Sequence, residues 1–303
     1  MPDTVDEFSF LPEQAREAGL DVPLPPGRRR ELRLGDGRAL SALQWGDGPP
    51  RVTLLHGVGL NAHTWDTTVL ALGVPALAID LAGHGDSSWR ADADYGPGSL
   101  APDIETALAT WTDRPQVLVG HSLGGLTAAI VAAHAPELIA RLALVDITPG
   151  IDPSAGPAVL REFFAGPTDF ASRAELVDRA QAFGMGGTRA QTERGVFFNT
   201  RVRADGRVEW KHHFARLAAQ PSEGASVLGD RGPLAPHGWS DLAAVRAPIT
   251  LVRGEHGFVS SDDAATFERH LPAADVVVLD APHNVQEVAP AALAALIRDR
   301  LDR

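Results

Sequence analysis

Residues 117–131 read VLVGHSLGGLTAAIV and carry the strongest structural signal of the chain. An apolar, β-branched stretch leads into Gly120–Gly124 (GHSLG), and an alanine-rich stretch typical of a helix follows. A serine hydroxyl is a poor nucleophile at neutral pH, so a reactive serine needs a tight turn where a base can reach it. Gly120 and Gly124 flank Ser122 where a Cβ would collide across such a turn. The stretch therefore predicts a strand, a sharp turn that presents Ser122, and a helix.

Apolar runs alternate with helical patterns along the chain, as a parallel sheet with crossover helices requires. The first two runs surround Asp36-Gly37 and indicate an opening hairpin. Eight strands are expected, at 30–34, 40–45, 52–55, 76–80, 117–119, 142–146, 249–253 and 276–279. Helices are expected at 64–72, 100–111, 123–135, 261–270 and 290–300, the last with Pro290 near its first turn.

The alternation stops between residues 148 and 240, where aromatic and alanine-rich stretches are interrupted by glycines. We expect this segment to be an inserted helical cap. Residues 1–27 form an N-terminal extension with a short amphipathic segment of its own, and residues 28–147 and 241–303 form the core. With 303 residues and 44% hydrophobic content, the chain is long enough for one large domain with such an insertion.

Charge and composition exclude several classes of partner. The formal net charge of −12 argues against nucleic acid and against anionic membranes. The chain contains no cysteine, which excludes disulfides, thiolate chemistry and cysteine-ligated metals. No signal sequence and no long apolar span is apparent, so we expect a soluble, cytoplasmic protein. The sequence leaves open whether the chain forms a homo-oligomer.

Four segments, in this order, resemble motifs of the α/β-hydrolase fold family over roughly residues 30–303. Residues 54–59 (LLHGVG) are similar to the oxyanion loop after strand 3, and residues 80–87 (DLAGHGDS) to the turn after strand 4. Residues 120–124 resemble the nucleophile elbow, and 283–285 (HNV) the late histidine loop. The resemblance implies an eight-stranded, mostly parallel sheet with helices on both faces. It says much less about the substrate, because this fold hosts many chemistries.

His283 is the expected general base, since it follows the last predicted strand and precedes the final helix. His212 and His213, in the expected cap, are weaker alternatives. The resemblance implies that His56 and His121 make local hydrogen bonds and that His84 orders a turn.

The acid departs from the commonest pattern of the family. Gly-x-x-Asp is expected after strand 7, but the chain reads Gly254-Glu255-His256-Gly257-Phe258. Asp146, at the end of strand 6, is the favoured alternative, because some subfamilies, dehalogenases and certain lactonases among them, place the acid there. Glu255 is the second choice, and Asp262, Asp263 or no acid at all are the others.

The resemblance implies a serine mechanism with Ser122 as nucleophile, His283 as base and a carboxylate that orients the imidazole. The backbone N–H groups of Val58 and Leu123 would form the oxyanion hole. No cofactor or metal is expected, because the sequence contains neither HExxH nor a glycine-rich phosphate loop.

Aromatic residues of the expected cap suggest an apolar substrate of moderate size. The candidate pocket residues are Trp65, Phe163, Phe164, Phe183, Phe198 and Trp210. Packing within the cap's own core is the rival interpretation for most of them. Residues 199–211 also resemble an Asn-x-Arg…Asp-Gly-Arg-x-x-Trp element of bacterial hydrolase caps.

The sequence thus favours a serine hydrolase acting on a small-molecule carboxylic ester or lactone. A C–C bond hydrolase of ring-cleavage products is the nearest alternative, with Arg161, Arg201 or Arg203 available for a substrate carboxylate. A non-catalytic, hydrolase-like ligand receptor is the third. Dehalogenase and epoxide hydrolase activities are disfavoured, because they use an aspartate where this chain has Ser122.

Overall fold

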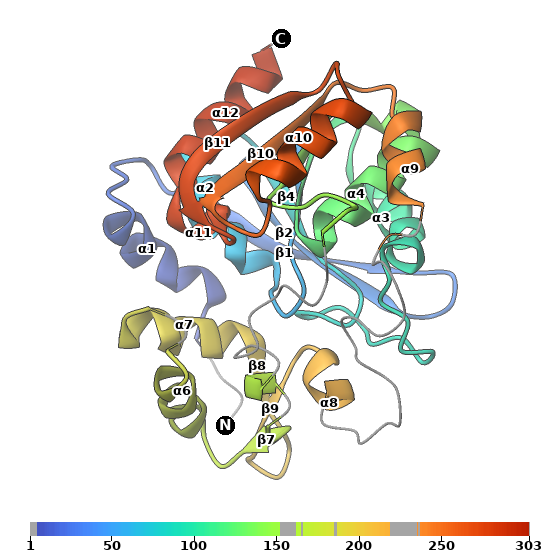
Figure 1. Ribbon diagram of the computed structural model, residues 1–303. Helices are drawn as coiled ribbons and strands as arrows, with labels where there is room; N and C mark the ends of the chain where they lie inside the picture. Colours follow the sequence, from blue (N-terminus) through green and yellow to red (C-terminus); the bar gives the residue numbers. More distant parts are fainter. Residues whose placement is uncertain are drawn as a thin grey trace.

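The computed structural model describes residues 5–151, 162–164, 166–184, 187–218, 235 and 237–302 (Figure 1). The expected central sheet is confirmed: eight strands pair in the order β1-β2-β4-β3-β5-β6-β10-β11. Their bounds are Gly27–Arg33 (β1), Ala39–Trp45 (β2), Val52–Leu55 (β3), Ala76–Asp80 (β4), Gln116–His121 (β5), Ile139–Val145 (β6), Ile249–His256 (β10) and Asp275–Pro282 (β11).

The opening hairpin is the antiparallel part of this sheet. β2 runs antiparallel to both β1 and β4, and the pairs from β4 to β11 are parallel. The Asp36-Gly37 turn joins β1 to β2, and Gly37 has a φ of +86°, which a residue with a side chain rarely adopts. All carboxyl ends of the parallel strands therefore lie at one edge, where the connecting loops can build a site.

Helices cover both faces of the sheet, and all five predicted helices are present. The helix α10 has the predicted bounds, whereas the helix predicted at 64–72 begins as a 3₁₀ turn, η2. The core helices are Ala62–Trp65 (η2), Asp66–Leu72 (α2), Pro97–Trp111 (α3), Leu123–His134 (α4), Pro136–Leu138 (η3), Gly238–Ala244 (α9), Ser261–His270 (α10), Val285–Val288 (α11) and Pro290–Asp302 (α12).

Side chains alternate along the strands between two buried clusters. One face packs against α3, α4, α9 and α10, with Leu118, Leu144 and Leu251 pointing toward them. The opposite face packs against α2 and α12, with Val119, Val145 and Val252. Because both faces are buried, the central strands are apolar at successive positions, as the sequence runs indicate.

The segment between β6 and β10 is not purely helical, contrary to expectation. It contains Arg173–Ala182 (α6), Arg189–Asn199 (α7) and Phe214–Ala218 (α8), and also a three-stranded sheet in the order β7-β9-β8. These strands are Asp169–Phe170 (β7), Thr200–Val202 (β8) and Val208–Trp210 (β9). Asp205-Gly206, which interrupts the helical pattern in the sequence, is the turn of the β8–β9 hairpin, with Gly206 at a φ of +81°.

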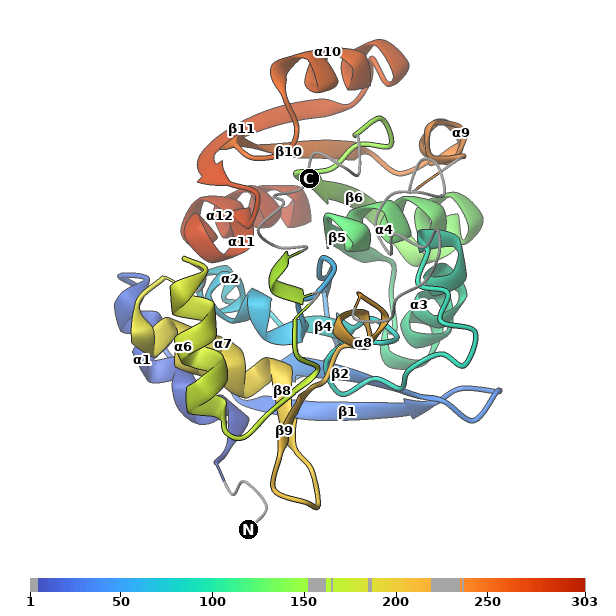
Figure 2. The same cartoon turned by 60° about the horizontal axis from the view of Figure 1, so that its bottom comes forward.

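This insertion contacts the loops that follow β3 and β4. The backbone N–H of His213 donates to the carbonyl oxygen of Gly83 at 2.8 Å, and the indole N–H of Trp89 donates to the carbonyl oxygen of Lys211 at 2.6 Å. Figures 1 and 2 show it on one side of the core. The insertion therefore lies at the carboxyl edge of the sheet.

The N-terminal extension contains a 3₁₀ turn, Glu7–Phe10 (η1), and a helix, Leu11–Glu17 (α1). Leu11 and Ala15 belong to the same buried cluster as α2 and α12. The expected amphipathic segment is therefore an additional layer on the core. Among the described residues, no helix combines the length and apolar character needed to cross a membrane.

Backbone atoms pack so closely around the turn at Ser122 that a side chain has no room at Gly124. A Cβ added to Gly124 would lie 2.5 Å from the backbone oxygen of Leu55. We predict that Gly124→Ala lowers the free energy of unfolding by about 3 kcal/mol, because backbone atoms must shift. Gly98→Ala is the matched control, since an added Cβ there meets no atom within 4 Å. It should raise stability by about 0.5 kcal/mol. Urea unfolding measures both, and equal effects would contradict the prediction.

Candidate active site

Ser122 lies on a strained turn between β5 and α4. Its φ is +52° and its ψ is −120°, a conformation that costs a side-chain-bearing residue on the order of 1–3 kcal/mol. Its backbone N–H donates to the carbonyl oxygen of Val145 at 3.1 Å, and its carbonyl oxygen accepts from Gly125 and Leu126. A Cβ on Gly120 would lie 2.3 Å from the backbone oxygen of Gly124, so both flanking glycines are required.

His283 and Asp146 meet beyond the carboxyl ends of β11 and β6. The Nδ1 of His283 lies 2.8 Å from Oδ2 of Asp146, whose side chain is fully buried. Asp146 also has a positive φ of +49°, which turns the chain sharply after β6. The sequence placed both residues at strand ends, and the geometry brings them into hydrogen-bond contact.

Backbone N–H groups at the end of β10 and in the loop that follows it hold the Asp146 carboxylate. Gly254, Phe258 and Val259 donate to it at 3.0, 2.6 and 3.4 Å. A buried carboxylate costs several kcal/mol unless such donors replace its water. The loop therefore holds a carboxylate that comes from another strand.

Gly257 explains how Asp146 fits there. It stands where Gly-x-x-Asp would put an aspartate, and a Cβ added to it would lie 2.2 Å from Oδ2 of Asp146. The space that a side chain at position 257 would occupy is filled by the Asp146 carboxylate. Glycine in place of the aspartate of the pattern thus leaves the room that the Asp146 carboxylate needs.

Two further rings orient His283. Phe258 stacks on its imidazole at a centroid distance of 3.7 Å and an interplanar angle of 13°. The Nε2 of His121 donates to the backbone carbonyl of His283 at 3.0 Å. Burial, together with the neighbouring His283, holds the pKa of His121 well below its usual value, so this imidazole is neutral. With Nδ1 engaged by Asp146, His283 retains Nε2 for proton transfer.

The loop after β3 lies close to Ser122. A Cβ on Gly57 would lie 3.1 Å from Cβ of Ser122. His56 fixes this loop, because its Nδ1 donates to the carbonyl oxygen of Gly57 at 2.8 Å and its Nε2 accepts from Leu81 N–H at 3.0 Å. Within the described part of the chain, the N–H groups of Val58 and Leu123 donate no hydrogen bond.

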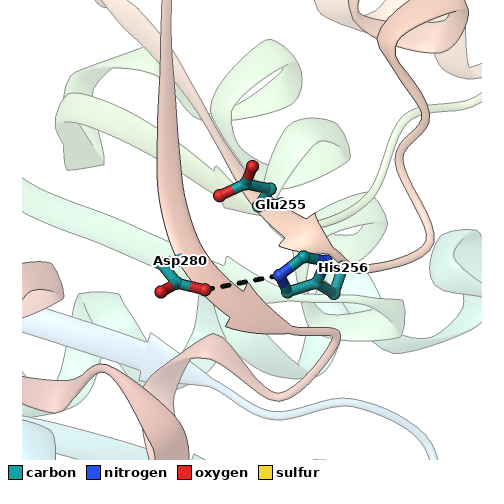
Figure 3. Close-up of side chains that lie close together, drawn as sticks. All are labelled: Glu255, His256 and Asp280. Atoms are coloured by element: carbon teal, nitrogen blue, oxygen red, sulfur yellow. Dashed lines mark ion pairs between the residues drawn. The ribbon is translucent and has the colours of Figure 1, made fainter.

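The other candidate acids lie elsewhere. Figure 3 shows Glu255 beside His256 and Asp280, with the His256–Asp280 ion pair at 3.4 Å. In the described residues these three exposed side chains are the group that could hold a metal ion, their ligand atoms lying within 4.8 Å of one another. Asp263 forms a capping box with Ser260 at the start of α10, and Asp262 lies in the same first turn.

The alternative histidines are engaged in the insertion. His212 is buried, its Nδ1 accepts from the N–H of Ala215 at 3.3 Å, and desolvation lowers its pKa to about 3. His213 stacks on Trp89 at 4.3 Å and lies 2.8 Å from the hydroxyl of Tyr95. Neither contacts Asp146.

Most of the candidate pocket residues pack within hydrophobic clusters. Trp65 is fully buried in the core, which argues against a pocket role. Phe163, Phe183 and Trp210 belong to the insertion's own cluster, as the rival interpretation has it. Phe198 stacks on His63. Phe164 also packs against the insertion's cluster, but a Cβ on Gly59 would lie 3.4 Å from its Cζ, so its ring borders the loop after β3 as well.

Sequence reasoning did not assign a role to Gly257 or Phe258. The signal was present as the departure from Gly-x-x-Asp, but a pattern that lacks a residue does not say which distant side chain replaces it. Contacts between positions 146 and 258 are tertiary.

The match to known proteins agrees with this geometry. A sequence model of the alpha/beta hydrolase fold matches residues 50–290. The chain belongs to the α/β-hydrolase fold family. The expected resemblance is therefore confirmed over most of the chain.

Relatives within the family include two proteins of Mycobacterium tuberculosis. The chain is 38% identical to Esterase Rv0045c, over 98% of this chain and 96% of the relative. It is 31% identical to Lipase LipV, over 84% of this chain and 94% of that one. A crystal structure described as a novel esterase, Rv0045c, superposes with a TM-score of 0.80 at 37% identity and covers 100% of both chains.

Gly257→Ala tests the contact that holds Asp146. The added Cβ would displace the carboxylate from His283, and a displacement of about 1 Å at such a site costs on the order of 100-fold in kcat. Gly195→Ala in α7 is the control, because an added Cβ there meets no atom within 4 Å. Steady-state hydrolysis by both variants measures the difference. Full activity of Gly257→Ala would mean that the Asp146–His283 contact is dispensable.

Proposed function

We propose that this protein is a serine hydrolase that cleaves a small-molecule carboxylic ester, with Ser122, His283 and Asp146 as its catalytic residues. The observation that carries the proposal is the 2.8 Å contact between His283 and the buried Asp146, at the sheet edge where the turn presents Ser122. The similarity to Esterase Rv0045c, which spans nearly the whole chain, supports ester hydrolysis.

The proposed reaction proceeds through an acyl-enzyme. Ser122 Oγ attacks the ester carbonyl carbon while its proton passes to Nε2 of His283. The tetrahedral intermediate collapses, the C–O bond to the alcohol breaks, and His283 returns the proton to the leaving oxygen. A water molecule then attacks the acyl-enzyme by the same route and releases the carboxylic acid. Asp146 holds the imidazole in the required tautomer and stabilises the imidazolium.

The N–H groups of Val58 and Leu123 are the proposed oxyanion hole. Both are unpaired among the described residues, and both adjoin Ser122 in space or in sequence. Two such preorganised donors stabilise the developing negative charge, each by on the order of 3 kcal/mol. The N-terminus of α4 adds its positive dipole end at Ser122.

Residues 148–240 are proposed to act as a cap over this site. The contact of Phe164 with Gly59 puts an aromatic ring of the insertion against the loop that carries the proposed oxyanion hole. Such a ring favours an apolar acyl or alcohol group. An open-chain ester and a lactone pass through the same intermediate, so both belong to the proposed substrate class.

Two of the three arginines considered for a C–C hydrolase are already paired. Arg201 forms an ion pair with Glu209 at 2.8 Å, and Arg203 forms ion pairs with Asp169 and Asp205. Arg161 lies outside the described residues. Neither described arginine is thus poised to bind a substrate carboxylate, which favours the ester over a dienoate substrate.

Asp146→Asn, Glu255→Gln and Ser122→Ala decide the proposed roles. We expect Asp146→Asn to lower kcat/KM by about 10⁴, the loss that follows wrong-tautomer substitution in a serine protease triad. Glu255→Gln should leave kcat/KM unchanged, because its side chain is exposed and it is Asp146 that contacts His283. Ser122→Ala should abolish turnover and labelling by a fluorophosphonate. The assay is hydrolysis of a panel of p-nitrophenyl esters and lactones.

Two outcomes would count against the proposal. A wild-type protein that binds esters without turnover would favour the receptor interpretation. A large loss in Glu255→Gln together with an active Asp146→Asn would transfer the acid role to Glu255.

A further inference from the structure

The N-terminal residues 5–20, here called the N-terminal strut, lie outside the segment 50–290 that matches the family model. They nevertheless contact both the core and the insertion. Figures 1 and 2 both show α1 beside α7. The strut therefore connects two parts of the molecule whose relative position shapes the proposed substrate pocket.

Charged hydrogen bonds join the strut to the core. Glu7 pairs with the guanidinium of Arg29, and its Oε2 lies 3.1 Å from Nε2 of His63. The other ring nitrogen of His63 lies 3.0 Å from Oδ2 of Asp66, which also accepts from Gln14 of the strut at 3.2 Å. The His63 side chain is 5% exposed, so both of its ring nitrogens are held by carboxylates away from water.

Aromatic contacts join the same histidine to the insertion. Phe198 of α7 stacks on His63 at a centroid distance of 3.7 Å and an interplanar angle of 8°. Phe10 of the strut packs against Phe197 and Phe198 at 5.2 and 5.3 Å, and Glu17 pairs with Arg194 at 2.6 Å.

Part of this interface is hollow. A groove of about 450 Å³ separates α1 from α6 and α7, lined in part by Phe10, Val177 and Phe197. The rings of Phe10, Phe197 and Phe198 and the Glu17–Arg194 ion pair thus join the strut to α7 beside this groove.

The contact lies close to the proposed oxyanion loop. His63 is in η2, a few residues after Gly59, and its backbone N–H donates to Oδ1 of Asn61 at 2.9 Å. The side-chain amide of Asn61 donates to Oδ1 of Asn199 at the end of α7, at 2.8 Å. Movement of α7 away from His63 would therefore open the insertion beside this loop.

We propose that His63 is a positioning residue: held between Glu7 of the N-terminal strut and Asp66 of the core, it fixes α7, through Phe198, at the side of the substrate pocket. This inference rests on the proposed ester hydrolase function for its effect on substrate binding. The expected effect on α7 is independent of the proposed function. The loop after β3 has separate supports in His56 and Asp80, so we expect the strut to act on substrate binding more than on chemistry.

The negative charges around His63 favour its protonated form, the imidazolium. Glu7 faces it from η1 and Asp66 from α2, Arg29 of β1 lies behind Glu7, and α7 contributes the uncharged Phe198. Burial opposes the charged form of His63, but the carboxylates outweigh it and raise its pKa to about 9.

For Glu7, burial also opposes the charge, whereas hydrogen bonds with His63 and Arg29 lower its pKa to about 2. The stability that His63 contributes is complete below its unfolded pKa of about 6.5 and is lost as the pH rises through about 9. The contacts of His63 with Glu7 and Asp66 should therefore weaken at alkaline pH.

Hydrogen–deuterium exchange at pH 7 tests the strut without any substrate. Glu7→Gln keeps the shape of the side chain but removes one of the two carboxylate charges that face His63, together with the charge that pairs with Arg29. We expect amides of peptides covering residues 189–199 to exchange about tenfold faster, the factor expected for loss of one charged hydrogen bond. Asp21→Asn is the control, because it removes the same charge from an exposed residue next to the strut. Equal exchange of α7 in both variants would overturn the proposal.

Kinetics of short and long esters test the link to binding. For Glu7→Gln we expect KM for p-nitrophenyl octanoate to rise about tenfold, with kcat within about twofold and the acetate ester little affected. In the wild type, KM for the octanoate ester should rise in the same way above pH 9. In Glu7→Gln this rise should occur at a lower pH. A merely structural role would lower stability without moving this pH profile.

Each failure has a separate meaning. Faster exchange of α7 with an unchanged KM and pH profile would overturn the positioning role of His63. If no ester is hydrolysed, the proposed function fails, while the exchange experiment still decides whether the strut holds α7.

Discussion

The candidate site depends on the hydrogen bonds made to the buried carboxylate of Asp146. A fully buried negative charge persists only where donors replace its water. Here β10 and the loop after it supply three backbone N–H groups, and His283 supplies the fourth contact. All of these donors lie more than 100 positions after Asp146 in the chain. Satisfying this one group therefore fixes the relative positions of the ends of β6, β10 and β11.

The same constraint decides which side chains the loop after β10 tolerates. Gly257 must lack a side chain because the carboxylate fills its space, while Phe258 both donates to Asp146 and stacks on His283. The proposed acid and the proposed base are thus both contacted by one loop. On the other side of the site, backbone packing around Gly120 and Gly124 holds Ser122 in a strained turn, so its geometry does not rely on the acid.

The insertion shows how packing sorts residues of the same type. Aromatic rings at positions 163, 183 and 210 are the insertion's own core, because a small unit must bury its apolar surface somewhere. Phe164 reaches the loop after β3, and Phe198 stacks on a buried histidine that the N-terminal strut holds. Composition could not separate these roles, since each ring satisfies the hydrophobic effect equally well. Which aromatic ring borders the site is decided by the residues that the ring contacts, not by the type of ring.

The sequence by itself determined the strands of the sheet, five of its helices and the turn at Ser122, because these depend on local patterns. Apolar runs, turn glycines and helix starts act over a few residues. The short helices α9 and α11 were not predicted. It also located His283 by its place after the last strand. It favoured Asp146 over Glu255 without excluding the latter. Both lie near strand ends at the same sheet edge, and the surroundings of Asp146 depend on N–H groups more than 100 positions along the chain. The hairpin around Asp205-Gly206 was missed because its strands are only three residues long and β9 is also paired with the distant β7. The contact of His63 with Glu7 and Phe198 joins three segments and leaves no periodic signal. Only the tertiary structure decides such contacts, since buried charges and rings are satisfied by whichever distant groups the fold brings to them.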